Sequence, residues 1–262
     1  MKNYILLLLI FCFSACKSSI NEKEDKIYSR HLQRHVELTI ISTQIPDTKS
    51  DMNLLLFNDA AVMEKIEAKK ILDSLNHLKQ LQPLVIVGIN ANKNTDYGLS
   101  ELAKISDSKA DKYSSFVINE LLPYIKKKTV IRKFKSVAIF GNSLSGVSAF
   151  DIAWQNADKI DKVGIFSGDF NYLNKSKNDS LNVVIETIQA SRKRPKLDYW
   201  IYAASDNDSS VIRNSISLSE IIKKKNADKI AGNEFIFDDK GGNDIATLRS
   251  RFAGFLLWAF SK

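Results

Sequence analysis

Hydrophobic positions along the chain follow two periods that alternate from one segment to the next. Short apolar or alternating runs predict strands, and longer stretches with helical spacing lie between them. The predicted strands are 36–43, 53–57, 83–89, 136–140, 162–168, 197–204 and 233–239. The predicted helices are 62–79, 108–127, Leu144 to about Gln155, about 178–191, about 209–225, and a last helix in the closing stretch that ends "FLLWAFSK".

Strand and helix alternate almost without exception from residue 53 onward. The run "PLVIVGI" at 83–89 is apolar throughout, which is typical of a central parallel strand buried on both faces. We therefore expect an α/β fold with a mostly parallel central sheet and helices on both faces. The chain has no Pro/Gly linker and no internal repeat, so one domain over 29–262 is expected.

The N-terminal stretch "MKNYILLLLIFCFSAC" has one positive charge, an apolar run and then small residues. It predicts an export signal, because it is too short for a membrane span with polar flanks. Cys16 stands where the apolar run ends, as in a bacterial lipoprotein signal. We expect a signal at 1–15, lipidation of Cys16, a tether at 16–28 and anchoring in the bacterial envelope. The alternative is an ordinary secretory signal that is cut nearby.

Cysteine and histidine are scarce, which narrows the chemistry. Both cysteines, Cys12 and Cys16, fall in the expected signal region, so a disulfide framework, a cysteine nucleophile and a thiolate metal site are excluded from the mature domain. The only histidines are His31, His35 and His77. The spacing of His31 and His35 could fit a weak metal site on a helix, but a surface pair at the start of a strand is the favoured interpretation. We expect no metal and no cofactor.

The formal net charge is +8, and the basic residues gather in short clusters such as "IKKK" and "RKFK". Such clusters are typical of solvated helix ends and loops, where cations are favourable at helix C-termini. Aromatic residues do not alternate with the basic ones, so a nucleic-acid partner is not expected.

One short stretch carries the candidate chemistry. Gly141–Gly146, "GNSLSG", follows the predicted strand 136–140 and opens a predicted helix. A tight strand–serine–helix turn is the arrangement of a nucleophile elbow, which needs small neighbours because the helix approaches closely. Gly141 and Ser143 fit the pattern G-x-S-x-G, whereas Ser145 stands at its last position. The alternative is an ordinary strand-to-helix turn without a nucleophile.

The chain also resembles a known family over about residues 50–262. The resemblance is carried by "LLLFNDA", "VIVGI" with "DYG", "YSSFVINELLPYI", "GNSLSGVSAFDIAW", "KVGIFSGDF" and "FLLWAF". These stretches are similar to the esterase family of α/β hydrolases that includes esterase D, enterochelin esterase and feruloyl esterase. The resemblance implies the α/β-hydrolase fold and action on a carboxylic ester, carbohydrate esters included.

The resemblance implies a role for several positions. It makes Ser143 the nucleophile and the backbone N–H of Leu144 one oxyanion donor. A second donor would come from Ala60 or Ala61, where the family usually has Asp-Gly and this chain has Asp59-Ala60. The acid would lie in "SDND", with Asp208 preferred to Asp206; either could instead cap the next helix.

The base position departs from the family. The family places a histidine before the last helix, and the matching residue here is Asn243, which cannot accept a serine proton at neutral pH. Together with Ser145 and Ala60 in place of glycine, this suggests relaxed demand for catalysis. Two hypotheses follow: an esterase that is slow or uses a substitute base such as Lys240, or a lipoprotein that binds a ligand or partner without turnover.

Overall fold

The computed structural model describes residues 20–43, 52–100, 108–171, 182–225 and 232–262. Within these ranges, eight strands form one sheet in the order β1-β2-β4-β3-β5-β6-β7-β8. The strands are β1 Ile20–Ser29, β2 Arg34–Thr43, β3 Asn53–Asn58, β4 Leu84–Ile89, β5 Val137–Asn142, β6 Lys162–Phe166, β7 Asp198–Ala204 and β8 Asn233–Asp238. The helices are α1 Ala60–Lys65, α2 Ala68–His77, α4 Ala110–Phe116, the π-helix η2 Val117–Leu121, α5 Leu122–Thr129, α6 Ser143–Gln155, α7 Val183–Ala190, α8 Ser209–Lys225 and α9 Ile245–Phe260.

The sheet is mostly parallel. Strands β3 to β8 all run in the same direction, whereas β2 pairs antiparallel with both β1 and β4. Parallel neighbours need a crossover, and helices supply these crossovers on both faces of the sheet. The α/β prediction with a mostly parallel sheet is thus confirmed.

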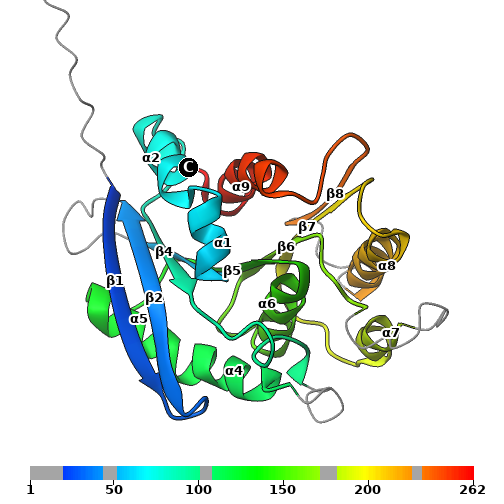
Figure 1. Cartoon of the computed structure of the whole chain (residues 1–262), viewed down its shortest axis with the longest axis horizontal. Helices are drawn as coiled ribbons and strands as arrows, with labels where there is room; N and C mark the ends of the chain where they lie inside the picture. Colours follow the sequence, from blue (N-terminus) through cyan, green and yellow to red (C-terminus); the bar gives the residue numbers. More distant parts are fainter. Residues whose placement is uncertain (1–19, 44–51, 101–107, 172–181, 226–231) are drawn as a thin grey trace, which may run out of the picture.

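Helices cover the sheet in two layers (Figure 1). One apolar core lies between the sheet and α4, η2, α5, α6, α7 and α8, and includes Phe116, Phe150 and Leu218. The other lies between the sheet and α1, α2 and α9, and includes Phe140 and Phe252. Strands β3 to β7 are buried from both sides, which explains the continuous apolar runs in their sequences.

Strand β1 corrects one expectation. Residues 20–28 were expected to belong to a tether, but they form a strand that pairs with β2 along its whole length. Its sequence "INEKEDKIYS" is mostly exposed because β1 is the edge of the sheet, so the hydrophobic pattern does not predict it. His31 therefore lies in the turn between β1 and β2, and His35 lies within β2, rather than ahead of the first strand.

Two predicted helices are divided in the structure. The segment 62–79 becomes α1 and α2, with a break at Glu67, whose φ of 54° is left-handed. The segment 108–127 is interrupted by the π-helix η2. The predicted helix at about 178–191 is found as α7, and its first residues, 178–181, lie outside the described ranges, as do the expected signal and Cys16.

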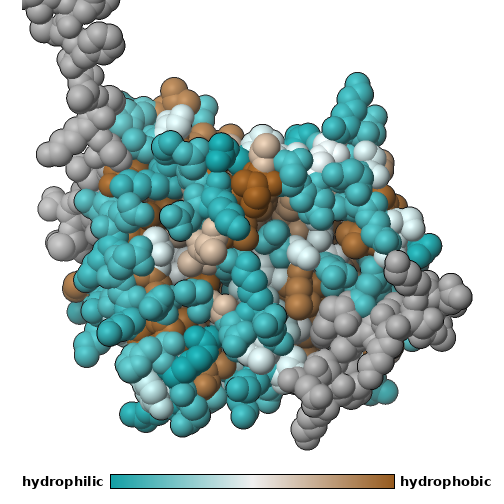
Figure 2. Space-filling view, viewed as in Figure 1, coloured by the Kyte–Doolittle hydropathy of each residue, from teal (hydrophilic) through white to brown (hydrophobic). Residues whose placement is uncertain are grey.

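The face seen in Figure 2 is covered mainly by hydrophilic residues, with hydrophobic ones in separate groups. None of the helices in the described ranges is both long and apolar enough to cross a bilayer.

Candidate active site

Ser143 lies where β5 ends and α6 begins. Its φ is +50°, in the left-handed region that costs a non-glycine residue roughly 1–2 kcal/mol. The side chain is partly exposed, since Ser143 is neither buried nor fully solvated. A strained serine between a central parallel strand and a helix is the geometry of a nucleophile elbow.

Two glycines let the elbow close tightly. A Cβ on Gly141 would stand less than 3.0 Å from the carbonyl oxygen of Ser145, and a Cβ on Gly146 would stand 2.9 Å from the carbonyl oxygen of Gly141. The first turn of α6 therefore packs directly on the end of β5. The second glycine that the turn needs is Gly146, one position later than in the pattern G-x-S-x-G.

Ser145 fits this turn without strain. The N–H of Asn142 donates to Ser145 Oγ at 3.0 Å, and Ser145 Oγ donates to the carbonyl oxygen of Asn142 at 2.8 Å. The Asn142 side chain in turn accepts from the backbone of Ser145, which completes a capping box. The serine thus has a structural use at this position, and its presence does not mark a decayed elbow.

The expected oxyanion donors lie at the start of two helices. Leu144 is in the first turn of α6, and Ala60 and Ala61 open α1. The first N–H groups of a helix have no partner inside it, so these amides are suited to bind a negatively charged oxygen. The strained residue of the α1 turn is Asp59, at φ 88°, whereas Ala60 is helical. Alanine at position 60 is therefore compatible with the turn, although the resemblance implies a glycine there.

Both carboxylate oxygens of Asp59 have a bonding partner. Its Oδ1 accepts from the N–H of Val62 at 3.2 Å, and its Oδ2 forms a 2.6 Å ion pair with Lys93 from the loop after β4. Only 6% of Asp59 is exposed. These contacts fix the turn that carries Ala60 and Ala61.

Asn58 joins the two donor turns, and sequence reasoning missed it. It is the last residue of β3 and fully buried, and its Nδ2 donates to the carbonyl oxygen of Ser145 at 3.2 Å. Its Oδ1 accepts from Tyr113 Oη at 2.9 Å. Burial raises the pKa of Tyr113 well above its ordinary value, so the phenol remains a donor. A polar residue ending an otherwise apolar strand, "NLLLFN", was the available signal.

The two candidate acids differ in their surroundings. Asp206 Oδ2 accepts a 3.0 Å hydrogen bond from the N–H of Asn243. Asp208 instead caps α8, since its Oδ1 accepts from the N–H of Ser210 at 2.8 Å and also from the Ser210 hydroxyl. The structure thus brings Asp206, the second choice, against the loop of Asn243, and leaves Asp208 with the capping task.

Asn207, between them, is a further residue that the sequence did not single out. Its Oδ1 accepts from the N–H of Ala204 at 2.8 Å and from Ser167 Oγ at 3.1 Å. Ser167, at the end of β6, is itself left-handed with φ 47°. Asn207 therefore ties the ends of β6 and β7 together beside Asp206.

A network of hydrogen bonds and an ion pair lies next to the loop between β8 and α9. Asp238, the last residue of β8, forms an ion pair with Arg251 and accepts from Tyr202 Oη at 3.1 Å. The hydrogen bond from Arg251 lowers the pKa of Asp238, while burial and the bond to Asp238 raise the pKa of Tyr202 to about 12. A Cβ on Gly241 would clash with the Asp238 carboxylate and with Tyr202 Oη, so glycine is needed where the loop passes these two groups.

None of the chain's three histidines lies in the loop before α9, where Asn243 stands. Asn243 is exposed, and its backbone rather than its side chain makes the bond to Asp206. His77 ends α2 at the opposite edge of the sheet from Ser143. His35 is in β2, three strand positions from β5 or about 14 Å. Lys240, the substitute base considered above, has an exposed side chain.

The histidines form no metal site within the described ranges, where no group of three His, Cys, Asp or Glu could hold an ion. His31 is exposed in a turn, and the ring of His35 packs edge-on against Tyr28.

Comparisons with solved structures agree with this geometry. A ferulic acid esterase superimposes with a TM-score of 0.71 at 18% identity, covering 92% of this chain and 98% of the other. Enterobactin esterase from Shigella flexneri gives 0.68 at 20% identity, and the chain spans 58% of that protein while 90% of the chain is covered. An IroE-like serine hydrolase from Shewanella oneidensis gives 0.68 at 13% identity, covering 91% and 79%. At these identities the likeness shows the fold alone, which is of the α/β-hydrolase type.

No curated protein sequence matches the chain. A family model does match it, over residues 32–229, and the description of that family is "Putative esterase". The match spans most of the chain and includes the elbow, the α1 turn and Asp206. The chain therefore belongs to this esterase family.

Proposed function

We propose that this protein binds a small carboxylic ester, carbohydrate esters included, at the Ser143 turn and hydrolyses it slowly or not at all. The observation that carries the proposal is the pairing of an intact elbow with Asn243 at the position of the base. The elbow keeps its strained serine, and the loop at 243 keeps its contact with Asp206.

The chemical reason is the missing proton acceptor. Acyl transfer to serine needs a base that takes the hydroxyl proton and later returns it to the leaving group. The amide of Asn243 can donate and accept hydrogen bonds, but it cannot carry out that cycle. Loss of a triad's base typically costs several orders of magnitude, with residual rate from the oxyanion donors and binding.

The parts that bind a carbonyl are supported independently of the base. The amides of Leu144, Ala60 and Ala61 begin two helices, and Asn58 holds those helices in fixed relation. An ester oxygen could accept hydrogen bonds there without reacting. Two of the solved neighbours are named as esterases of ferulic acid and of enterobactin, which supports ester ligands as the first class to screen.

We further propose that the protein is exported and anchored through a lipid on Cys16. The support is the sequence pattern of residues 1–16 alone. Intact-mass analysis of the protein purified from its host membrane tests it: a diacylated or triacylated N-terminal cysteine is expected. An unmodified N-terminus upstream of Cys16 would contradict the anchor without bearing on the site.

The test of the site compares wild type with Ser143→Ala on p-nitrophenyl acetate. The proposal expects a low wild-type rate that changes less than about threefold on removal of the hydroxyl, because no base activates it. A robust wild-type rate that Ser143→Ala abolishes would mean that a substitute base operates, and Lys240→Met would then identify whether it is Lys240. Binding of ester analogues, measured by calorimetry, should persist in both proteins.

A further inference from the structure

The start of the described chain and the start of β5 lie on the same edge of the sheet. The register runs in one row from Asn21 to Ser42, Val85, Leu54 and Val137, across β1, β2, β4, β3 and β5. We call this the amino edge, because the parallel strands begin there. Ser143 is at the other edge, six residues farther along β5, or about 20 Å away.

A dense basic segment covers the amino edge. Residues 126–135, "KKKTVIRKFK", hold six basic and no acidic side chains. Its place follows from the chain path, because it joins the end of α5 at Thr129 to the start of β5 at Val137. Within it, Lys128 pairs with Asp25, in the middle of β1, at 3.1 Å. Among the described residues, no ion pair is found for the other five.

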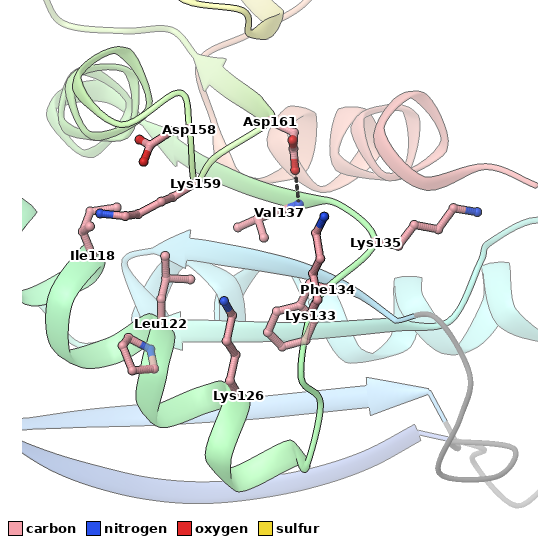
Figure 3. A pocket seen from close by; sticks show the side chains of 11 residues that line it. Ile118, Leu122, Lys126, Lys133, Phe134, Lys135, Val137, Asp158, Lys159 and Asp161 are labelled. Carbon is pink, nitrogen blue, oxygen red and sulfur yellow. Dashed lines mark hydrogen bonds between the residues drawn. The ribbon is translucent and has the colours of Figure 1, made fainter.

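Part of this segment borders a hollow of about 380 Å³ (Figure 3). Its apolar lining includes Leu122, Phe134 and Val137, and four lysines surround it: Lys126, Lys133, Lys135 and Lys159. Of the two acidic groups, Asp161 is engaged by the N–H of Val137 at 2.8 Å, and Asp158 is exposed. The lysine ammonium groups are thus available to an external anion.

The most exposed large hydrophobic side chains of the described ranges are on this edge as well. Val130, within the basic segment, is 81% exposed, and Leu78, at the end of α2, is 64% exposed. Val130 has a φ of 58°, which is strongly disfavoured for a β-branched residue. The left-handed backbone of Val130 caps the end of α5, where its N–H bonds to the carbonyl oxygens of Lys126 and Lys127. The cap needs only the backbone, so the exposed valine side chain is free to contact a partner.

We propose that the amino edge docks on an anionic phospholipid bilayer, with Val130 and Leu78 entering the interface and the lysines facing lipid phosphates. Cationic side chains around apolar tips match the two layers of such a surface, charged headgroups over acyl chains. A soluble protein partner would not require cationic side chains and exposed apolar side chains together on the edge where the described chain begins.

This orientation fits the expected anchor but does not depend on it. Cys16 is four residue steps before Ile20, a reach of about 14 Å when extended, so a lipid on Cys16 would hold the amino edge at the membrane. The Ser143 turn would then face away from the bilayer and remain open to ligands in solution. Docking of the amino edge does not require the Ser143 site to turn over its ligand.

The test uses the unacylated chain from residue 16 onward, which contains every described helix and strand. Its sedimentation with phosphatidylcholine vesicles containing phosphatidylglycerol is compared with pure phosphatidylcholine, at low and high salt. We expect binding to the anionic vesicles that weakens with salt. The variant Lys133→Gln/Lys135→Gln/Lys159→Gln should bind at least about tenfold more weakly, since each surface cation contributes roughly fivefold.

A matched triple at the other edge, Lys109→Gln/Lys112→Gln/Arg213→Gln, removes the same charge and should stay within about twofold of wild type. Val130→Gly, which relieves the left-handed strain, should fold normally and still bind more weakly. Equal loss in both triples would show unspecific attraction by net charge and would overturn the proposal. Absence of vesicle binding, or tighter binding to heparin than to anionic vesicles, would overturn it too.

Discussion

The backbone N–H of Asn243 donates a 3.0 Å hydrogen bond to Oδ2 of Asp206. This bond joins the loop before α9 to the loop after β7, where the resemblance leads us to expect the base and the acid. Because the donor is main chain, the contact does not depend on which side chain stands at 243. The loop can therefore keep its position when that side chain is exchanged.

Gly141 should be intolerant of a side chain. A Cβ there would press on the backbone carbonyl of Ser145, which cannot move without opening the turn. We expect Gly141→Ala to lower the free energy of unfolding by about 2 kcal/mol or more, measured by urea denaturation. The control is Gly254→Ala in α9, where nothing lies within 4 Å of the added Cβ; it should stabilise by about 0.5–1 kcal/mol. Equal effects in the two variants would refute the tight elbow.

Restoring the family's glycines should not restore catalysis. Ser145→Gly removes the hydroxyl of the capping box and should cost about 1 kcal/mol of unfolding free energy. Ala60→Gly should be slightly destabilising, because Ala60 is already helical. Rates on p-nitrophenyl acetate should stay within about twofold of wild type in both. A tenfold gain in either would indicate that turn geometry, and not the base, limits the rate.

The network next to the loop between β8 and α9 predicts a pH dependence of stability. The pKa of Asp238 is lowered in the folded state, chiefly by the hydrogen bond from Arg251. A lowered carboxyl pKa stabilises the fold above the unfolded-state pKa, and this contribution disappears as pH falls through the folded-state pKa. Asp238→Asn should therefore be less stable than wild type at neutral pH, with the difference shrinking at strongly acidic pH. A difference that is independent of pH would contradict this assignment.

Sequence patterns predicted the central strands and most helices because these are buried on one face or two. Strand β1 was not predicted, because an edge strand with charged side chains shows no apolar period. The breaks at Glu67 and at η2 in two predicted helices were not predicted, because the helical spacing of apolar residues continues through them.

Some features of the candidate site could likewise be predicted from local sequence, and others could not. The turn at Ser143 follows from a strand, small residues and a helix in succession, all of them local features. The choice between Asp206 and Asp208 depends on a contact across 37 residues, which local pattern cannot supply. Likewise, the fit of Ser145 and Ala60 depends on φ angles and on a buried Asn58 from another strand.

The central claim is that the missing general base is what limits catalysis at this site. The most direct measurement is the rate of Asn243→His on p-nitrophenyl acetate, with Asn243→Gln and Asn243→His/Ser143→Ala as controls. A histidine at 243 would stand beside Asp206, so turnover should rise at least about tenfold, and general-base help can reach roughly 10²–10⁴-fold. The gain should vanish in the double variant and be absent in Asn243→Gln. No gain with histidine, in a variant that folds like wild type, would contradict the claim.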